Sequence, residues 1–238
     1  MKQAENKCIY VVEKNIKETH DVSTLETHIL NEKMPQYSAG QYITVYFPQS
    51  GTPEGKAYSI SNPPGTKTIN ITVKAMGEFS RKLTALRPGD MITGSLPYGY
   101  FYSESINTPL VLIAAGIGIA PFRSIIGDAF SKDPKRSITV LYSSKTSDDI
   151  LFKEELDEFM TLYPNFKVVY FLTRETIHHK NIVCSRISKE NFLAHAKIVE
   201  DAEYMICGSI SFTRDMWKML RAVGVIEEKI YTEAFFSH

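Results

Sequence analysis

Cysteine is scarce in this chain, with three residues among 238, Cys8, Cys184 and Cys207. They are too few and too widely spaced to form a disulfide framework or a zinc site. A plant-type iron–sulfur cluster needs four cysteines, most of them closely spaced. The chain therefore cannot supply such a cluster by itself.

Net charge and long apolar runs are also lacking. The 27 Lys and Arg residues balance the 27 Asp and Glu residues, so no overall field favours nucleic acid or a membrane surface. The N-terminal stretch lacks the apolar run of a signal peptide. No stretch approaches the roughly 18 apolar residues of a membrane span. We therefore expect a cytoplasmic protein with no nucleic-acid partner, while a local patch for a protein partner stays open.

The first half of the chain has the pattern of β structure. Short runs rich in Ile, Val, Tyr and Thr are separated by turn clusters, at 8–13, 25–30, 41–47, 56–60, 69–74 and 91–95. Several short strands with regular turn signals predict a small antiparallel barrel, here of six strands over residues 1–104. One short helix is expected at 78–86.

In the second half of the chain, the pattern of hydrophobic residues changes after a polar connection at 103–108. A continuous apolar run at 109–116 is typical of a strand buried on both faces. Strands at 137–143, 167–173, 202–208 and 229–235 then alternate with helices at 120–131, 151–162, 188–197 and 212–223. This alternation predicts a five-stranded parallel, doubly wound sheet forming a second domain over residues 105–238.

Two neighbouring segments of the first half carry candidate ligand-binding residues. Lys56-Ala-Tyr58-Ser59 precedes an Asn-Pro-Pro break, and the run ITVKAMGEFS at 71–80 leads into the expected helix. The free N–H groups of a helix N-terminus bind phosphate. The structural alternatives are an ordinary strand with an exposed lysine and a core tyrosine, and a simple serine cap of the helix.

A glycine pair lies where the first parallel strand gives way to a helix, as Gly116-x-Gly118-x-x-Pro121. Open α/β sheets bind ligands at this edge, and Pro121 suits the first helical turn. The spacing departs from G-x-G-x-x-G, which argues against an ordinary dehydrogenase. Cys207-Gly208 ends the fourth strand and should face the same crevice. A tight strand–helix turn and a buried core cysteine are the alternatives.

In order and spacing, these motifs resemble the ferredoxin–NADP reductase superfamily over about residues 8–236, in its form without an iron–sulfur domain. The resemblance implies that Tyr58 lies along a flavin ring and that Ser59 reaches its N5 or O4. Lys56 stands where the family usually has arginine, which keeps the charge but loses the bidentate fork. The resemblance also assigns two further sets to the flavin: Thr72, Val73 and Lys74 to its ring edge or ribityl side, and Gly77, Phe79 and Ser80 to its phosphates.

The same resemblance assigns the second half to a nicotinamide nucleotide. It implies that Gly116, Gly118 and Pro121 approach the pyrophosphate and that Cys207 and Gly208 abut the site of hydride transfer. Glu233 would orient the nicotinamide or relay a proton, and Phe236 or its neighbour Phe235 would cover the flavin. Thr173 and Arg174, with Lys145 and Arg186 nearby, favour NADPH over NADH as the substrate.

The function implied is that of an NAD(P)H-dependent flavoprotein reductase. Hydride would pass from NAD(P)H to bound FAD, with FMN as the alternative flavin, and electrons would pass on to ferredoxin, flavodoxin or a haem protein. Two other classes stay open. One is an electron-transfer subunit of a multicomponent oxygenase or other complex, and the other is a non-catalytic flavin- or nucleotide-sensing module. No metal site is expected, because His178-His179 lacks companions at metal spacing.

Overall fold

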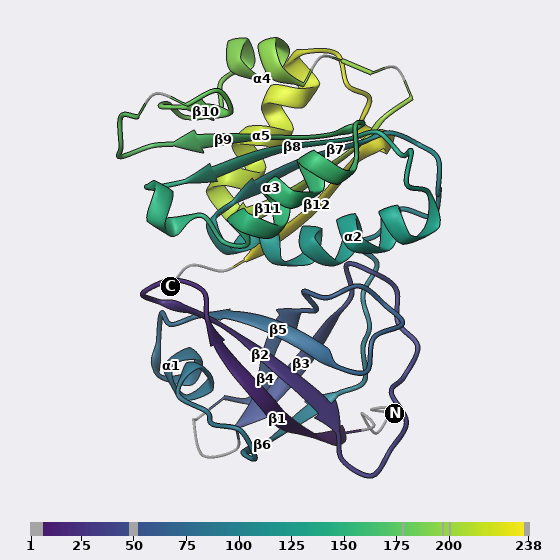
Figure 1. Ribbon diagram of the computed structural model, residues 1–238, viewed down its shortest axis with the longest axis vertical. Helices are drawn as coiled ribbons and strands as arrows, with labels where there is room; N and C mark the ends of the chain where they lie inside the picture. The colour runs from purple at the N-terminus through teal and green to yellow at the C-terminus, as the bar shows by residue number, and fades with distance from the viewer. Residues whose placement is uncertain (1–6, 48–51, 178, 197, 200, 236–238) are drawn as a thin grey trace. The chain divides into compact units, whose positions relative to one another are not determined.

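The computed structural model describes residues 7–47, 52–177, 179–196, 198–199 and 201–235 (Figure 1). The chain divides into two compact units. One unit consists of Met1–Tyr102 and Ala120–Asp128, and the other of Ser103–Ile119 and Ala129–His238. Each unit contains one six-stranded sheet.

The first sheet is antiparallel throughout and runs in the order β4-β3-β6-β1-β2-β5. A single bridge between Ile60 and Ile71 joins the end of β4 to β5 and brings the two edges of the sheet together. The predicted six-stranded antiparallel barrel is confirmed. Its strands are β1 (Lys7–Lys17), β2 (Val22–Ile29), β3 (Tyr42–Phe47), β4 (Thr52–Ser59), β5 (Ile69–Lys74) and β6 (Met91–Ser95).

Alternation of apolar and polar residues produces the core of this barrel. Along β1, Cys8, Tyr10 and Val12 are buried while the residues between them are more exposed, as the pleat of a half-buried strand requires. The predicted short helix is α1 (Glu78–Thr84), and it adds Phe79 and Leu83 to the same core. The helix therefore covers the barrel with its apolar side.

The second sheet is parallel throughout and runs in the order β10-β9-β8-β7-β11-β12. It has six strands where the sequence predicted five. The additional strand, β10, has two residues, which is too short to show any hydrophobic period. The strands are β7 (Leu110–Ala115), β8 (Ile138–Ser144), β9 (Phe166–Leu172), β10 (Ile182–Val183), β11 (Glu203–Ser209) and β12 (Ile230–Phe235).

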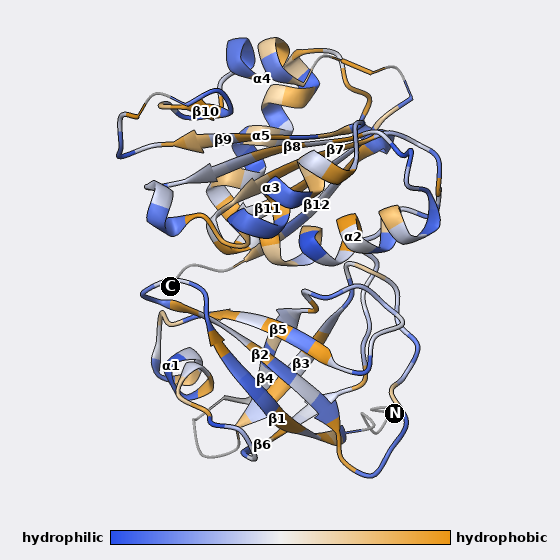
Figure 2. Cartoon of the chain, viewed as in Figure 1, coloured by the Kyte–Doolittle hydropathy of each residue, from blue (hydrophilic) through white to orange (hydrophobic). Residues whose placement is uncertain are grey.

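Helices cover both faces of the parallel sheet. Val169 packs in one apolar cluster with Phe192 and Leu220, which belong to α4 and α5. The next residue of β9, Tyr170, points to the opposite face and donates a hydrogen bond to Asp157 of α3. Figure 1 shows α3 and α5 on opposite sides of the sheet, and Figure 2 shows the strands between them mostly in the hydrophobic colours. The helices are α2 (Ile119–Lys132), α3 (Lys153–Leu162), α4 (Lys189–His195) and α5 (Ile210–Ala222), with 3-10 turns η2 (Gly116–Gly118), η3 (Ser147–Asp149) and η4 (Glu227–Lys229).

The order of the parallel strands identifies where a ligand should bind. From β7 the chain adds β8, β9 and β10 on one side, and then returns to place β11 and β12 on the other side. The strand order therefore reverses between β7 and β11, and open α/β sheets bind ligands at the carboxyl ends of the strands at such a point. Among the described helices, none is both long and apolar enough to cross a membrane.

Candidate functional site

The barrel brings its two predicted ligand-binding segments together where the edges of the sheet meet. We call this place the barrel seam, residues 59–61 and 70–72, and it is joined by the Ile60–Ile71 bridge. Ser59 is the last residue of β4 and is buried, yet its hydroxyl has no hydrogen-bond partner among the described residues. Because buried hydroxyls are nearly always bonded, this atom is suited to meet a bound ligand.

An aromatic cluster lies beside Ser59. The rings of Tyr58 and Phe79 stack with centroids 6.4 Å apart and an interplanar angle of 19°. The Lys56 ammonium lies 5.6 Å from the centroid of the Phe79 ring, and burial raises the pKa of Tyr58 above its ordinary value. Phe79 is a core residue that supports Tyr58 and Lys56, and these two residues form the outer part of the cluster.

The three β5 side chains that the sequence assigned to the flavin are occupied within the barrel. The Thr72 hydroxyl lies 2.9 Å from that of Thr24 and donates to the Ser61 hydroxyl, also at 2.9 Å. Val73 is fully buried in the core. The Lys74 ammonium lies 3.2 Å from a carboxylate oxygen of Asp21. This strand can therefore serve a ligand chiefly through its backbone.

The turn before α1 is held by Ser80. Its hydroxyl accepts hydrogen bonds from the N–H groups of Met76 at 2.9 Å and Gly77 at 3.1 Å, and donates to the Gly77 carbonyl at 3.1 Å. Gly77 is the N-cap of α1 and Ser80 is its third residue, so the serine is not the simple N-cap that the sequence offered as an alternative, although its hydroxyl closes the turn. A Cβ atom on Gly77 would meet nothing within 4 Å. The turn therefore adjoins open space, and its contribution to a phosphate would come from the first backbone N–H groups of α1.

The glycine loop, Gly116–Gly118, follows β7 directly. Gly116 has a left-handed φ of +52°, and a Cβ atom there would meet nothing within 4 Å. By contrast, a Cβ on Gly118 would lie 2.2 Å from the carbonyl oxygen of Cys207. Gly116 is thus required by its backbone conformation beside open space, while Gly118 is required by close packing against β11. Pro121 is the third residue of α2 and lies in the first helical turn, as predicted.

Cys207 and Glu233 are register partners on β11 and β12. Oxygen Oε2 of Glu233 is buried and has no partner in the part of the chain that the structure describes, and burial raises the pKa of this carboxyl to about 7. The thiol of Cys207 is fully buried, and burial together with the charge of Glu233 raises its pKa well above the ordinary value. Cys207 is therefore a neutral thiol rather than a nucleophile.

Gly208, the next residue of β11, allows α5 to begin close to the strand. A Cβ there would lie 2.7 Å from a ring carbon of Phe212 and 3.2 Å from the Cβ of Ala115. Its role is packing at the carboxyl ends of β7 and β11. Phe235 ends β12 and is partly exposed, whereas Phe236 lies outside the described residues.

Thr173 and Arg174 follow β9 and are exposed. The Thr173 hydroxyl donates to the Ser144 carbonyl at 3.3 Å, and the Arg174 N–H donates to the Lys145 carbonyl at 2.8 Å. These contacts fix the pair at the carboxyl ends of β8 and β9. Arg186 lies beyond β10 and is also exposed.

Sequence reasoning missed a carboxylate at this edge. Glu175 accepts hydrogen bonds from the Ser147 N–H at 2.5 Å and from the Ser147 hydroxyl at 3.1 Å. Glu175 directly follows Arg174 in the chain. Its carboxylate occupies the N–H and the hydroxyl of Ser147, which are donors of the kind that bind phosphate. No local pattern could have linked two residues 28 positions apart in the chain.

Sequence reasoning also passed over Tyr142, which looks like one more residue of a buried strand. Its hydroxyl donates to the Gly116 carbonyl at 3.1 Å and accepts from the Leu151 N–H at 3.2 Å. It therefore contacts the glycine loop directly.

Among the described residues, no group of three or more His, Cys, Asp or Glu side chains is placed to hold a metal ion.

Comparison with known families and proteins agrees with the two units. An oxidoreductase FAD-binding domain matches residues 10–102, and an oxidoreductase NAD-binding domain matches residues 112–218. The chain belongs to the ferredoxin–NADP reductase superfamily. It is thus an oxidoreductase with FAD-binding and NAD-binding domains.

The curated relatives of this reductase-family chain are longer proteins. It is 31% identical over 239 residues to a flavohemoprotein of Bacillus subtilis, covering 95% of the chain and 58% of the relative. It is 27% identical over 223 residues to one subunit of a Na(+)-translocating NADH-quinone reductase of Neisseria meningitidis, covering 86% and 54%. The chain thus spans little more than half the length of the relatives it matches.

Solved structures support the fold. The FAD/NAD-binding domain of a nitric oxide dioxygenase from Vibrio cholerae has a TM-score of 0.85 at 24% identity, covering 96% of this chain and 98% of that one. A ferredoxin NADP+ reductase from Neisseria gonorrhoeae, with bound FAD and NADP, has a TM-score of 0.81 at 20% identity, covering 98% and 100%.

The residues of this superfamily member fit the two ligands that its domains imply. The unpartnered Ser59 hydroxyl and the Tyr58–Phe79 stack, which involve consecutive residues at the end of β4, suit a flat ring with polar atoms at its edge. The open space beside Gly116 and the Glu233 oxygen, which has no partner among the described residues, suit a dinucleotide at the carboxyl edge of the parallel sheet.

Proposed function

We propose that this chain is an NAD(P)H-dependent flavoprotein reductase, which moves a hydride from NAD(P)H to bound FAD and passes electrons on to a protein acceptor. One observation carries the proposal. A single chain matches an FAD-binding and an NAD-binding oxidoreductase domain, and the barrel and the parallel sheet each contain a buried polar atom without a partner among the described residues, Ser59 Oγ and Glu233 Oε2. The FAD, when bound, supplies the redox chemistry that side chains lack. We assign residues 1–104 to flavin binding and 105–238 to nucleotide binding.

In the barrel, each assigned residue has a separate task. Lys56 offers a phosphate one positive charge without the two parallel bonds of an arginine. Tyr58, stacked on Phe79, presents an aromatic face to the ring. Ser59 offers a hydroxyl donor to the polar edge of that ring. The first backbone N–H groups of α1, after Gly77, offer donors to the phosphates.

In the parallel-sheet unit, the glycine loop offers backbone N–H groups to the pyrophosphate of the nucleotide. Cys207, as a neutral thiol, forms a small wall of the nicotinamide pocket. Glu233 is partly protonated near neutral pH, because burial raises its pKa, so Oε2 can hold or donate a proton or orient the carboxamide of the nicotinamide. Thr173 and Arg174 favour a 2′-phosphate, whereas the charge of Glu175 opposes one, so both NADPH and NADH are candidate substrates.

For the acceptor we propose a haem protein, because curated relatives from Bacillus subtilis and Rhizobium meliloti are flavohemoproteins. Ferredoxin and flavodoxin are the other candidates. The similarity to a subunit of a Na(+)-translocating NADH-quinone reductase supports a second function, as an electron-transfer component of a larger complex. The buried Ser59 hydroxyl and Glu233 oxygen, which have no partner among the described residues, together with the buried Cys207 thiol count against a non-catalytic sensing module.

The deciding experiment is an anaerobic absorbance titration of the purified protein with NADPH and then NADH. We expect a yellow protein whose flavin absorbance is bleached by one or both donors, the more effective donor being the substrate. Subsequent addition of a haem protein or a ferredoxin should restore the flavin absorbance for the correct class of acceptor. A colourless protein that takes up no added FAD would contradict the proposal, and co-purification with a stable partner would favour the second function.

A further inference from the structure

Tyr142 of β8 joins two segments at the carboxyl edge of the parallel sheet. It is fully buried, and its hydroxyl donates to the Gly116 carbonyl while accepting from the Leu151 N–H, at 3.1 and 3.2 Å. Gly116 opens the glycine loop, and Leu151 lies just before α3. One neutral hydroxyl therefore connects the loop after β7 to the segment after β8.

The first of these hydrogen bonds helps to set the direction of a peptide group, because the Gly116 carbonyl accepts from the Tyr142 hydroxyl as well as from the Ile119 N–H of the 3-10 turn. In a planar trans peptide, the carbonyl of one residue and the N–H of the next point in opposite directions. Because the Gly116 carbonyl is held toward Tyr142, the N–H of Ile117 is turned away from it. That N–H lies in the first turn after the strand, where backbone donors have no acceptor within the helix. The tyrosine thus orients a donor of the kind that binds phosphate oxygens.

The glycine loop needs such a restraint. Gly116 has a left-handed φ of +52°, and glycine loses more conformational freedom on ordering than any other residue. The Tyr142 ring, by contrast, is fixed in the sheet, where it is the register partner of Tyr170 with ring centroids 6.3 Å apart. Burial raises the pKa of Tyr142, so its hydroxyl remains a donor over the whole working pH range.

We propose that Tyr142 is a positioning residue for nucleotide binding, whose hydroxyl holds the glycine loop in the conformation that presents its N–H groups to the pyrophosphate. The inference rests on the proposed function, since it names a residue that prepares the nucleotide site. It adds a role for a side chain that need not touch the nucleotide.

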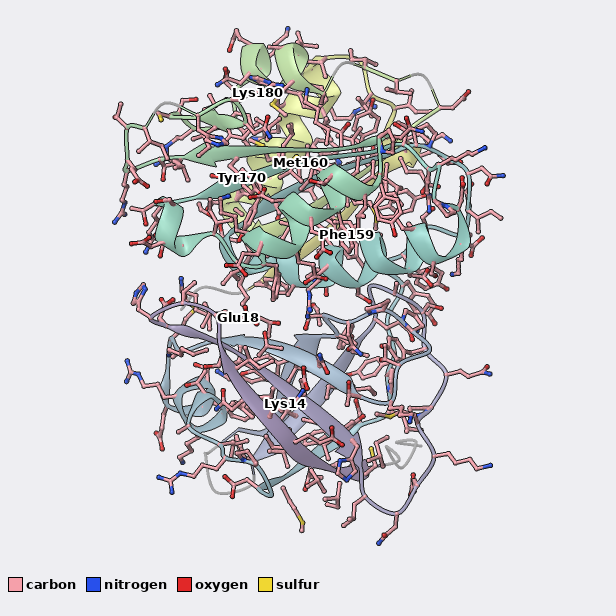
Figure 3. The ribbon with its side chains drawn as sticks, in the orientation of Figure 1. Lys14, Glu18, Phe159, Met160, Tyr170 and Lys180 are labelled. Atoms are coloured by element: carbon pink, nitrogen blue, oxygen red, sulfur yellow. The ribbon has the colours of Figure 1, made fainter. Side chains whose placement is uncertain are left out.

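Tyr142→Phe tests this role, and Tyr170→Phe is its matched control. Tyr170 is also buried and lies on the same face of the next strand, but its hydroxyl donates to Asp157 of α3 at 2.7 Å and so serves a helix rather than the glycine loop. Figure 3 labels Tyr170 on β9, together with Phe159 and Met160 of α3. Each variant removes one hydroxyl from the sheet and keeps the ring.

The measurement is calorimetric titration of the FAD-loaded full chain with ADP-ribose, which contains a pyrophosphate, and with AMP, which does not. We expect Tyr142→Phe to weaken ADP-ribose binding about 3- to 10-fold, the worth of one hydrogen bond. AMP binding should change less than about twofold. Tyr170→Phe should leave both affinities unchanged. Equal weakening of both ligands by Tyr142→Phe, or the same loss in Tyr170→Phe, would overturn the inference.

Amide hydrogen exchange of the wild-type protein gives a second test that needs no variant to fold. ADP-ribose should slow exchange at the Leu151 N–H more than AMP does, because this N–H is bonded to the hydroxyl that holds the loop. Equal protection by the two ligands would overturn the inference. Wild-type protein that binds neither ligand would overturn the proposed function and this inference with it, whereas normal binding by Tyr142→Phe would overturn the inference alone.

Discussion

The barrel and the parallel sheet place their candidate binding residues differently. In the barrel, Thr72 and Ser80 use their hydroxyls for hydrogen bonds within the fold. In the parallel sheet, Glu233 keeps a buried oxygen with no partner among the residues described. A barrel whose side chains fill its own core leaves mainly backbone and the seam for a ligand. An open parallel sheet leaves whole side chains at its carboxyl edge, where successive loops diverge.

Ser59 differs from Thr72 and Ser80 because its buried hydroxyl has no partner among the described residues, and its substitution should have the largest effect. Ser59→Ala removes a donor aimed at the proposed flavin, so we expect the rate of FAD reduction by NAD(P)H to fall about 10²- to 10³-fold. Stopped-flow absorbance under anaerobic conditions measures this rate. The control is Thr72→Val, which removes a hydroxyl that is already bonded within the barrel. It should cost about 1 kcal/mol of stability and leave the rate nearly unchanged. Similar rates for the two variants would show that Ser59 is only structural.

The contrast between these two hydroxyls marks the limit of what the sequence could predict. The sequence identified the motif residues and every long strand and helix, because these have strong hydrophobic periods. It missed β10, which has only two residues, and the bond between Ser147 and Glu175, which depends on how β8 and β9 pair. Whether a hydroxyl is satisfied is decided by neighbours distant in the chain, so the sequence could assign both Ser59 and Thr72 to the flavin but could not predict which hydroxyl the fold leaves without a partner among the described residues.

Glu233 should make the stability of the protein depend on pH. Burial raises its folded pKa to about 7, above the ordinary 4.5, so the folded protein binds this proton more tightly than the unfolded chain does. The stabilising effect of the proton is complete below about pH 4.5 and is lost as the pH rises through about 7, with up to about 3 kcal/mol involved. Glu233→Gln removes this titration. Denaturant unfolding should find the variant more stable than the wild type at pH 8, by an amount that disappears at pH 4. Thr72→Val in the barrel should show no such trend, and a difference for Glu233→Gln that is constant with pH would contradict the raised pKa.

One glycine from each region sharpens the comparison further. Gly118→Ala would place a Cβ atom 2.2 Å from the Cys207 carbonyl oxygen, so either the glycine loop or β11 must move. We expect a loss of about 2 kcal/mol in the free energy of unfolding, together with weaker nucleotide binding. Gly77→Ala, in the open turn of the barrel, should cost less than about 1 kcal/mol. Thermal melting and nucleotide titration of both variants check this. Equal costs would mean that the close approach of the glycine loop to β11 is not a constraint.

Substitution of Cys207 tests whether this side chain, at the carboxyl edge of the parallel sheet, shapes the proposed nicotinamide pocket without taking part in hydride transfer. Because burial raises the pKa of its thiol and keeps it neutral, Cys207→Ala should remove volume beside the nicotinamide and slow FAD reduction about tenfold, with little loss of bound FAD. Cys207→Ser, which restores most of the volume, should recover part of the rate. Single-turnover reduction at the wild-type rate in Cys207→Ala would rule out this role. Loss of FAD in the same variant would instead indicate a general structural defect.

Glu175 should give the smallest effect, because it lies at the solvent-facing edge where charges are screened. Glu175→Gln removes the negative charge beside Arg174 while keeping an oxygen that can accept from Ser147. We expect the ratio of kcat/KM for NADPH to that for NADH to rise about threefold to fivefold at low salt, and by less at high salt. Glu190→Gln, which makes the same charge change in the first turn of α4, is the control and should leave the ratio unchanged. A ratio that stays constant in Glu175→Gln would mean that the 2′ position of the bound nucleotide does not lie near the ends of β8 and β9. In that case the preference for either nucleotide would have to come from a different part of the parallel-sheet unit.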